Sequence, residues 1–285
     1  MDLIHQLNDF TLYRRQNETF HSGYRYENSL SFETLAYPME MTLWFQNNWH
    51  HSITISVVYY ILIRSIQRLM RDRQAFTLEI PLFYWNSFHA IYSTIAFARL
   101  AEDVGHSYSI SFYDAICRTC HPNDAAAFWN LTFAISKIIE LGDTLFIVLR
   151  KKPLIFLHYY HHAAVLIYTV HSGAEHIGVG RSFIMMNLFA HALMYTYYAT
   201  KTTKLQIPRW VAMVVTTVQT TQMLLGVLLS ACVYWIKTNT DWRCQQSMGN
   251  LYLAFVIYVT FGVLFAQFFY KAYLRPRNQK TKKLE

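Results

Sequence analysis

The chain has 285 residues, of which 53% are hydrophobic, 17% are aromatic and only 15% are charged. Soluble domains carry about 25% charged residues, so this composition excludes an ordinary soluble protein and indicates one embedded in a lipid bilayer. The formal net charge is +8 at pH 7, but the basic residues occupy short connections between apolar segments. Because they form no basic groove with stacking aromatics, no nucleic-acid partner is expected.

Apolar segments follow one another along the chain, each close to the length of about 20 residues that a helix needs to cross a bilayer. They lie at about 49–69, 80–102, 125–149, 154–172, 181–201, 208–236 and 248–274. We therefore expect an all-α integral membrane protein with about seven transmembrane helices. Only the corner Arg150–Pro153 joins the third segment to the fourth, so these two should form an antiparallel hairpin.

Neither a flexible linker nor an internal repeat divides the chain. The sequence therefore predicts a single membrane domain over 1–285, with an N-terminal segment at 1–48, a helical bundle at about 49–274 and a tail at 275–285. The N-terminal segment is polar and mixed, without the short apolar core of a cleavable signal peptide.

Lysine and arginine are distributed unequally between the two sets of connections. Sixteen lie at 64–73, 150–152, 201–209 and 271–283, and seven lie on the opposite side. Because cytoplasmic connections carry the excess of basic residues, the N-terminal segment should be luminal and the C-terminal tail cytosolic.

Two short motifs agree with this orientation. Asn17 opens an Asn-Glu-Thr glycosylation acceptor on the side predicted to be luminal. Lys282 and Lys283 form a dilysine tail of the kind read in the cytosol as a retrieval address. We therefore expect a multi-pass glycoprotein of the endoplasmic-reticulum membrane.

Three cysteines, Cys117, Cys120 and Cys244, fall on the side predicted to be luminal. That compartment is oxidising, so we expect a disulfide between Cys244 and either Cys117 or Cys120. The alternative is a Cys-x-x-Cys metal pair, but the chain lacks a second pair at suitable spacing. No cysteine lies near the cytoplasmic side of the bundle, so a thiolate nucleophile is not expected there.

A cluster of histidines, His158, His161 and His162, interrupts the otherwise apolar fourth segment. In a helix these residues stand at positions i, i+3 and i+4 and share one face. Ionisable residues at membrane depth usually face a protein interior or a water-filled cavity and mark function. The sequence therefore predicts a reactive site on this face.

Other segments carry polar residues at helical spacing. Lys137, Glu140 and Asp143 lie on the third segment, Asn187 and His191 on the fifth, and Gln219 and Gln222 on the sixth. Each set has a structural alternative, because interhelical hydrogen bonds and buried ion pairs also hold membrane helices together. Single histidines such as His89 and His171 are expected to be hydrogen-bonded interior residues.

Taken in order, these motifs resemble those of the very-long-chain fatty acid elongases, membrane condensing enzymes of the endoplasmic reticulum. The resemblance rests on Lys137-x-x-Glu140-x-x-Asp143-Thr144, His158-x-x-His161-His162, Met186-Asn187-x-x-x-His191-x-x-Met194-Tyr195-x-Tyr197-Tyr198 and Thr216-x-x-Gln219-x-x-Gln222. It covers residues 46–285. The aromatic-rich third motif and Gln46-Asn47-Asn48-Trp49 are most similar to the branch that acts on saturated and monounsaturated chains.

The resemblance implies condensation of a fatty acyl-CoA with malonyl-CoA to give 3-ketoacyl-CoA, CoA and carbon dioxide. Histidine can serve as a covalent nucleophile, and imidazole is largely neutral at cytosolic pH because its unperturbed pKa is about 6.5. Following the family, we expect His161 to form an acyl-imidazole, with His158, His162 and His191 assisting. Asn187 and Gln219 are expected to stabilise developing negative charge.

The resemblance also implies the remaining parts of the site. Lys137, Glu140, Asp143 and Gln222 would support the histidines from neighbouring helices. Cations at the cytoplasmic mouth would meet the CoA phosphates, and the candidates are Arg150, Lys151, Lys152, Lys201, Lys204, Arg209 and Lys271. No cofactor and no metal are expected. The implied partners are 3-ketoacyl-CoA reductase, the dehydratase, enoyl reductase and a second copy of the chain.

Two other functions compete with this interpretation. Membrane desaturases and hydroxylases also use a histidine box, but two irons need several histidine clusters and this chain has one. A mononuclear site from His158, His161, His191 and Glu140 stays open, since imidazole and carboxylate suit iron and zinc. A non-catalytic receptor or transporter is disfavoured because the polar residues gather in the half predicted to be cytosolic.

Overall fold

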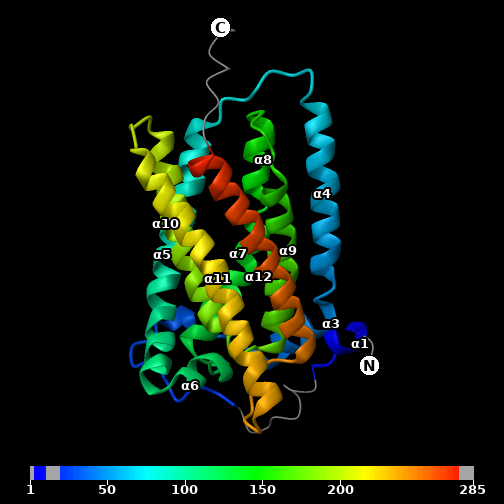
Figure 1. Cartoon of the computed structure of the whole chain (residues 1–285), viewed down its shortest axis with the longest axis vertical. Coiled ribbons are helices and arrows are strands. Elements are labelled where there is room, and N and C mark those ends of the chain that lie inside the picture. Colours follow the sequence, from blue (N-terminus) through cyan, green and yellow to red (C-terminus); the bar gives the residue numbers. More distant parts are fainter. Residues whose placement is uncertain (1–2, 11–19, 276–285) are drawn as a thin grey trace.

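The computed structural model describes residues 3–10 and 20–275, and these form an elongated bundle of helices (Figure 1). The helices are α1 (Leu3–Leu7), α3 (Pro38–Asn48), α4 (His51–Leu69), α5 (Glu79–Ile110), α6 (Phe112–Cys117), α7 (Ala125–Ile139), α8 (Gly142–Leu149), α9 (Phe156–Glu175), α10 (Gly180–Thr202), α11 (Arg209–Asn239) and α12 (Met248–Phe269). A 3-10 turn, η1 (Ser31–Glu33), precedes α3, and a π-helical turn, η2 (Tyr270–Leu274), extends α12. The predicted all-α class is confirmed for the described residues.

The long helices run parallel to the long axis of the bundle and alternate in direction (Figure 1). α9 is the central helix, because α3, α4, α7 and α12 all pack on it, while α10 packs along α5 and α11 along α12. Within the described residues, Arg209–Asn239 and Met248–Leu274 are each long and apolar enough to cross a membrane by themselves. The count of seven spans stays a prediction.

The pass predicted over 125–149 is divided in two. α7 ends at Ile139, Glu140 and Leu141 form a turn, and α8 starts at Gly142. A Cβ atom on Gly142 would lie 2.7 Å from the indole ring of Trp85. Because such a contact is too close for any other residue, Gly142 lets α5 approach the chain where the helix is broken.

The two ends of the bundle differ in character. The basic connections 70–78, 150–155 and 203–208 lie at the end from which the C-terminal tail leaves, and α3 and α6 lie at the other end (Figure 1). Which membrane face each end meets stays a prediction. Asn17, Lys282 and Lys283 lie outside the described residues.

At the end of the bundle where α3 and α6 lie, which we call the N-terminal end, a disulfide joins Cys117 of α6 to Cys244 in the connection between α11 and α12. Cys120 is a free thiol. Backbone hydrogen bonds reinforce the join, since the Gln245 N–H donates to the Cys117 carbonyl (2.9 Å). The sequence left open which of the two nearby cysteines pairs with Cys244, and the structure chooses Cys117.

Two buried ion pairs involve the C-terminal half of α5. Arg181, near the start of α10, is 1% exposed and donates to Asp103 (2.8 Å). Glu33, fully buried, accepts hydrogen bonds from the Arg99 guanidinium (2.6 and 2.7 Å) and from Trp129 Nε1 (2.7 Å). The first pair joins α10 to α5, and the contacts of Glu33 hold the polar N-terminal segment against α5 and α7.

Glu33 should make stability depend on pH. Burial alone would raise the pKa of its carboxyl, but hydrogen bonds from Arg99, the Leu30 N–H and Trp129 lower that pKa from 4.5 to about 2. Because folding lowers the pKa, the stabilisation is complete above about pH 4.5 and is lost as the pH falls towards 2.

The test compares wild type with Glu33→Gln by thermal unfolding in detergent across pH 7 to 2. The two free energies of unfolding should differ at neutral pH, and the difference should narrow by about 3 kcal/mol at the acid end. A difference that does not change with pH would contradict the role assigned to Glu33.

Candidate active site

A large cavity opens at the tail end of the bundle, and we call it the wide cavity. Its volume is about 670 Å³, within the range of small-molecule and cofactor sites. α5, α8, α9, α10 and α11 supply its polar lining, which comprises Asn86, Asp143, His158, His161, His162, Asn187, His191, Tyr195, Gln219 and Gln222. The structure therefore brings the polar residues of five separate helices together.

The histidine box lies on one side of this cavity. His158 Nε2 lies 2.9 Å from the hydroxyl of Thr144, which in turn bonds Tyr59 (2.6 Å). His162 is buried, with Nε2 3.9 Å from Asp143 Oδ2. His161 is partly buried, touches the ring of Phe261 (centroids 4.9 Å apart) and makes no hydrogen bond to any residue the structure describes. Of the three imidazoles, His161 has its nitrogens least committed to the protein.

An ion pair lies below the box. Lys137 Nζ donates to Glu140 Oε1 (2.8 Å) and to Asn187 Oδ1 (3.0 Å), and all three residues are buried. His191 Nδ1 lies 3.6 Å from the same carboxylate oxygen. Because lysine can only donate, it must bond the amide oxygen of Asn187, which leaves the amide N–H groups to donate elsewhere. Asn187 lines the wide cavity, so a ligand oxygen there can accept from it.

Asp143 joins two further residues that we did not single out as site residues from the sequence. Its carboxylate accepts from Trp85 Nε1 (2.5 Å) and from the Tyr195 hydroxyl (2.7 Å). The Tyr195 ring stacks on His89 at a centroid distance of 4.8 Å. Asp143 therefore connects α5, α8 and α10 beside His162, directly after the break between α7 and α8.

The remaining polar candidates divide by position. Gln219 and Gln222 of α11 both line the wide cavity, and Gln219 Nε2 lies 3.1 Å from the Met194 sulfur. Among the basic candidates, Arg150, Lys152, Lys201 and Lys204 line the cavity.

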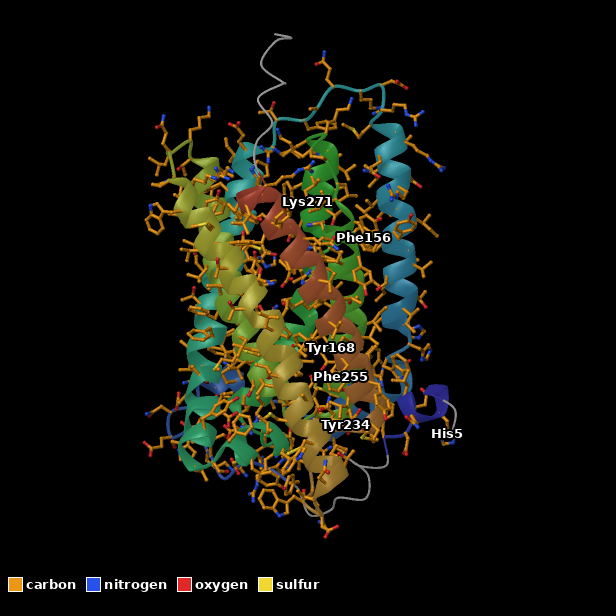
Figure 2. The ribbon with its side chains drawn as sticks, viewed as in Figure 1. His5, Phe156, Tyr168, Tyr234, Phe255 and Lys271 are labelled. Atoms are coloured by element: carbon orange, nitrogen blue, oxygen red, sulfur yellow. A yellow bond between two sulfur atoms is a disulfide. The ribbon has the colours of Figure 1, made fainter. Side chains whose placement is uncertain are left out.

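The structure does not bring the other three cations into either cavity. Lys151 Nζ donates to the carbonyls of Arg71 and Arg73 (3.0 and 2.8 Å), so it fastens the connection between α4 and α5. Arg209 donates to the Ala272 carbonyl (2.9 Å), and Lys271 is exposed near the tail (Figure 2).

A second and smaller cavity, of about 150 Å³, continues along α9 towards the N-terminal end, and we call it the narrow cavity. Its walls are mainly apolar, with Val165, Phe183, Phe261 and Tyr168 among them, and α3 lines its far end. Figure 2 shows Tyr168 farther from the tail than Lys271. His161, Asn187, Gln222 and Met223 line both cavities. His161 therefore lies where a polar cavity meets an apolar one.

Two single histidines behave differently from each other. His171 is hydrogen-bonded on both nitrogens, to the Leu7 carbonyl and to Asn250 (each 2.8 Å), as expected for an interior histidine. His89 is fully buried, yet neither nitrogen has a hydrogen-bond partner in the described structure. Across the described residues, no group of three or more His, Cys, Asp or Glu side chains is arranged to hold a metal ion.

Residues 44–281 match the family described as ELO: GNS1/SUR4 family. The chain is 55% identical over 280 residues to "Putative fatty acid elongase 4" of Caenorhabditis elegans, covering 98% of this chain and 96% of that protein. The chain belongs to the ELO family of fatty acid elongases. It is also 38% identical to very long chain fatty acid elongase 6 of Drosophila melanogaster (85% of this chain, 78% of that protein) and 36% identical to human very long chain fatty acid elongase 3 (85% and 90%).

Membership confirms the resemblance read from the four motifs, and it makes this elongase a membrane enzyme of fatty acid elongation that takes acyl-CoA substrates. The comparisons do not assign the chain to one branch of the family, because very long chain fatty acid elongases 6 and 3 match it at similar identity. Trp85 and Thr144 contact the cavity residues Asp143 and His158, and sequence reasoning left both without a role. Thr144 stood inside the quoted motif, whereas no spacing rule connects Trp85 on α5 to the box on α9.

Proposed function

We propose that this elongase condenses a fatty acyl-CoA with malonyl-CoA through an acyl-imidazole on His161. The observation that carries the proposal is the position of His161 at the junction of the two cavities. An acyl thioester has a polar CoA part and an apolar tail, and its carbonyl lies between them. The wide cavity suits CoA and the narrow cavity suits the hydrocarbon chain of the acyl group. This arrangement leaves the thioester carbonyl beside His161.

The reaction then proceeds in two half-reactions. In the first, a ring nitrogen of His161 attacks the thioester carbonyl, the C–S bond breaks, and CoA leaves as the thiol with the proton that the imidazole releases. In the second, malonyl-CoA loses carbon dioxide, and the electron pair of the broken C–C bond forms a new bond to the acyl carbon. The C–N bond breaks, the imidazole regains a proton, and 3-ketoacyl-CoA is the product.

The surrounding residues support these steps. Asn187 keeps its amide N–H groups free to donate to the tetrahedral oxyanion, because its oxygen already accepts from Lys137. Gln219 is the second donor from across the wide cavity. His191 and His158 bind or exchange protons with the malonyl group, and His162 with Asp143 orients the box.

The single most direct test is a condensation assay with purified protein, acyl-CoA and malonyl-CoA labelled in the carbon that is retained. The product should be 3-ketoacyl-CoA two carbons longer than the substrate, with no added metal. Stoichiometric iron in the purified protein, together with activity abolished by a chelator, would instead favour the desaturase or hydroxylase alternative. Ligand-gated transport without turnover would favour a receptor or transporter.

Cations at the outer end of the wide cavity should hold the CoA phosphates. Arg150→Gln and Lys152→Gln should each raise KM by about 3- to 10-fold with little change in kcat, because they weaken ground-state and transition-state binding equally. The effect should shrink as salt screens the charges. Arg68→Gln is the matched control, since Arg68 is exposed in α4 and lines neither cavity. Equal effects from all three variants would contradict a specific CoA site.

The cellular setting of this enzyme belongs to the same proposal. The basic tail end faces the cytosol, the N-terminal segment carries a glycan on Asn17, and Lys282 and Lys283 return the protein to the endoplasmic reticulum. There the keto product passes to 3-ketoacyl-CoA reductase, the dehydratase and enoyl reductase. The chain acts as a single domain, on saturated and monounsaturated acyl groups, and self-association is expected.

A further inference from the structure

Two helical glycines line the narrow cavity, Gly173 inside α9 and Gly180 at the first position of α10, and only Gly173 has open space at its Cβ position. Gly173 lies in the last turn of α9, and glycine is among the residues least favourable for a helix. It is exposed, although its neighbours Ser172 and Ala174 are buried and α9 is the central helix of the bundle. Gly173 lines the narrow cavity, which accounts for this exposure. A Cβ atom there would meet nothing within 4 Å.

The distance from His161 to Gly173 can be expressed as a length of acyl chain. The two residues are twelve positions apart in α9, which at about 1.5 Å per residue is about 18 Å. An extended hydrocarbon chain rises about 1.25 Å per carbon, from a C–C bond of about 1.5 Å and an angle of about 111°. About 14 carbons therefore separate the level of His161 from that of Gly173.

Residues of α3 line the cavity near Gly173. Thr42 of α3 lies across the end of α9, with its hydroxyl 2.8 Å from His176 Nε2. Thr42, His176 and Met41 all line the narrow cavity at this end. Room beyond the level of Gly173 therefore lies beside α3, and Thr119, Cys120 and Pro122 also line this cavity.

We propose that Gly173 is a specificity-determining position of this enzyme, whose missing side chain admits acyl chains longer than about 14 to 16 carbons. The inference rests on the proposed function, because it assumes that the acyl chain starts at His161. A side chain at this position would project into the path of the acyl chain. It would leave shorter chains, which end before Gly173, without contact to it.

The experiment measures kcat/KM for saturated acyl-CoA substrates of 12 to 22 carbons with wild type, Gly173→Leu and Gly173→Ala. For Gly173→Leu we expect the 12-carbon substrate to stay within about twofold of wild type and substrates of 18 carbons or more to fall at least about tenfold. Gly173→Ala, which adds one methyl group, should reduce only the longest substrates. Gly105→Leu is the matched control, since Gly105 is a helical, exposed glycine with open space at its Cβ that lines neither cavity.

The results separate this inference from the proposed function. A wild type without condensation at any chain length would refute the proposed function. A wild type that elongates while Gly173→Leu keeps the same length profile, or loses all lengths equally, would refute the inference alone. A wild type that rejects every chain above 16 carbons would refute it too, as would a Gly173→Leu protein that cannot fold beside a normal Gly105→Leu protein.

Discussion

Replacing His161 by alanine should lower condensation at least about 10³-fold, because the variant lacks the nitrogen that would accept the acyl group. The fold should tolerate the change. His161 is only partly buried, lines both cavities and makes no hydrogen bond within the described chain, so no buried polar partner is left unsatisfied. Turnover is measured with labelled malonyl-CoA, and folding by thermal unfolding in detergent.

The covalent step can be observed apart from turnover. Incubating wild type with acyl-CoA alone should release one CoA per protein and add the mass of the acyl group, and peptide mapping should place it on His161. His161→Ala should do neither. His51→Ala is a suitable control, because His51 is an exposed histidine that opens α4 at the opposite end of the bundle. An acyl adduct on another side chain, or wild-type turnover in His161→Ala, would contradict the assignment of His161 as the nucleophile.

Replacing Lys137 by methionine should destabilise the protein by about 3–5 kcal/mol, the cost of leaving one member of a buried ion pair without its partner. Glu140 would lose the lysine that contacts it at 2.8 Å, and Asn187 would lose the donor that fixes its amide. Activity should fall at least about 100-fold, since the oxyanion donor and His191 are no longer held in place. Thermal unfolding and condensation are both measured.

The double variant Lys137→Met with Glu140→Met separates structural from catalytic roles. Replacing a buried ion pair by apolar residues of similar volume is often neutral or stabilising. The double variant should therefore recover most of the stability lost by Lys137→Met while kcat stays low. If it recovers activity together with stability, the pair serves packing only, which is the alternative that the sequence left open.

Much of the architecture follows from composition and periodicity. Six of the seven apolar segments correspond to single long helices, and the segment at 125–149 corresponds to α7 and α8 together. The boundaries are close to those expected, because both lipid and the bundle interior select apolar side chains. The main departure in length is α5, predicted over 80–102, which continues to Ile110. Its last turns carry the buried Asp103 and Ser107, whose contacts with Arg181 keep a polar stretch helical.

Features that depend on contacts between distant segments were out of reach. The break at Glu140 and Leu141 lies inside a segment that the sequence predicts as one continuous pass, and only Gly142 gives a local sign of it. Gly142 packs against the indole of Trp85, 57 residues earlier in the chain, which no periodicity connects to α8. The role of α3 was also missed, because a polar N-terminal segment gives no sign that it lines a cavity.

The sequence predicted which residues belong to the candidate site more fully than how those residues are arranged. Spacing places His158, His161 and His162 on one face, but it cannot tell which imidazole is hydrogen-bonded and which faces the junction of the cavities. Likewise, charge alone could not separate Arg150, which lines the wide cavity, from Lys151, which binds backbone carbonyls. Adjacent residues on a turn point in different directions, and only the fold decides which direction each one takes.

The covalent link between Cys117 and Cys244 has a consequence for how the molecule must be threaded during synthesis. Such links form where oxidants are supplied and are undone where glutathione keeps thiols reduced. A chain inserted in the inverted orientation would therefore lack the Cys117–Cys244 disulfide. Its histidine box would also open to the opposite side of the membrane. Counting free thiols with a mass tag, two in correctly inserted chains and four in inverted ones, would report orientation from a gel band alone.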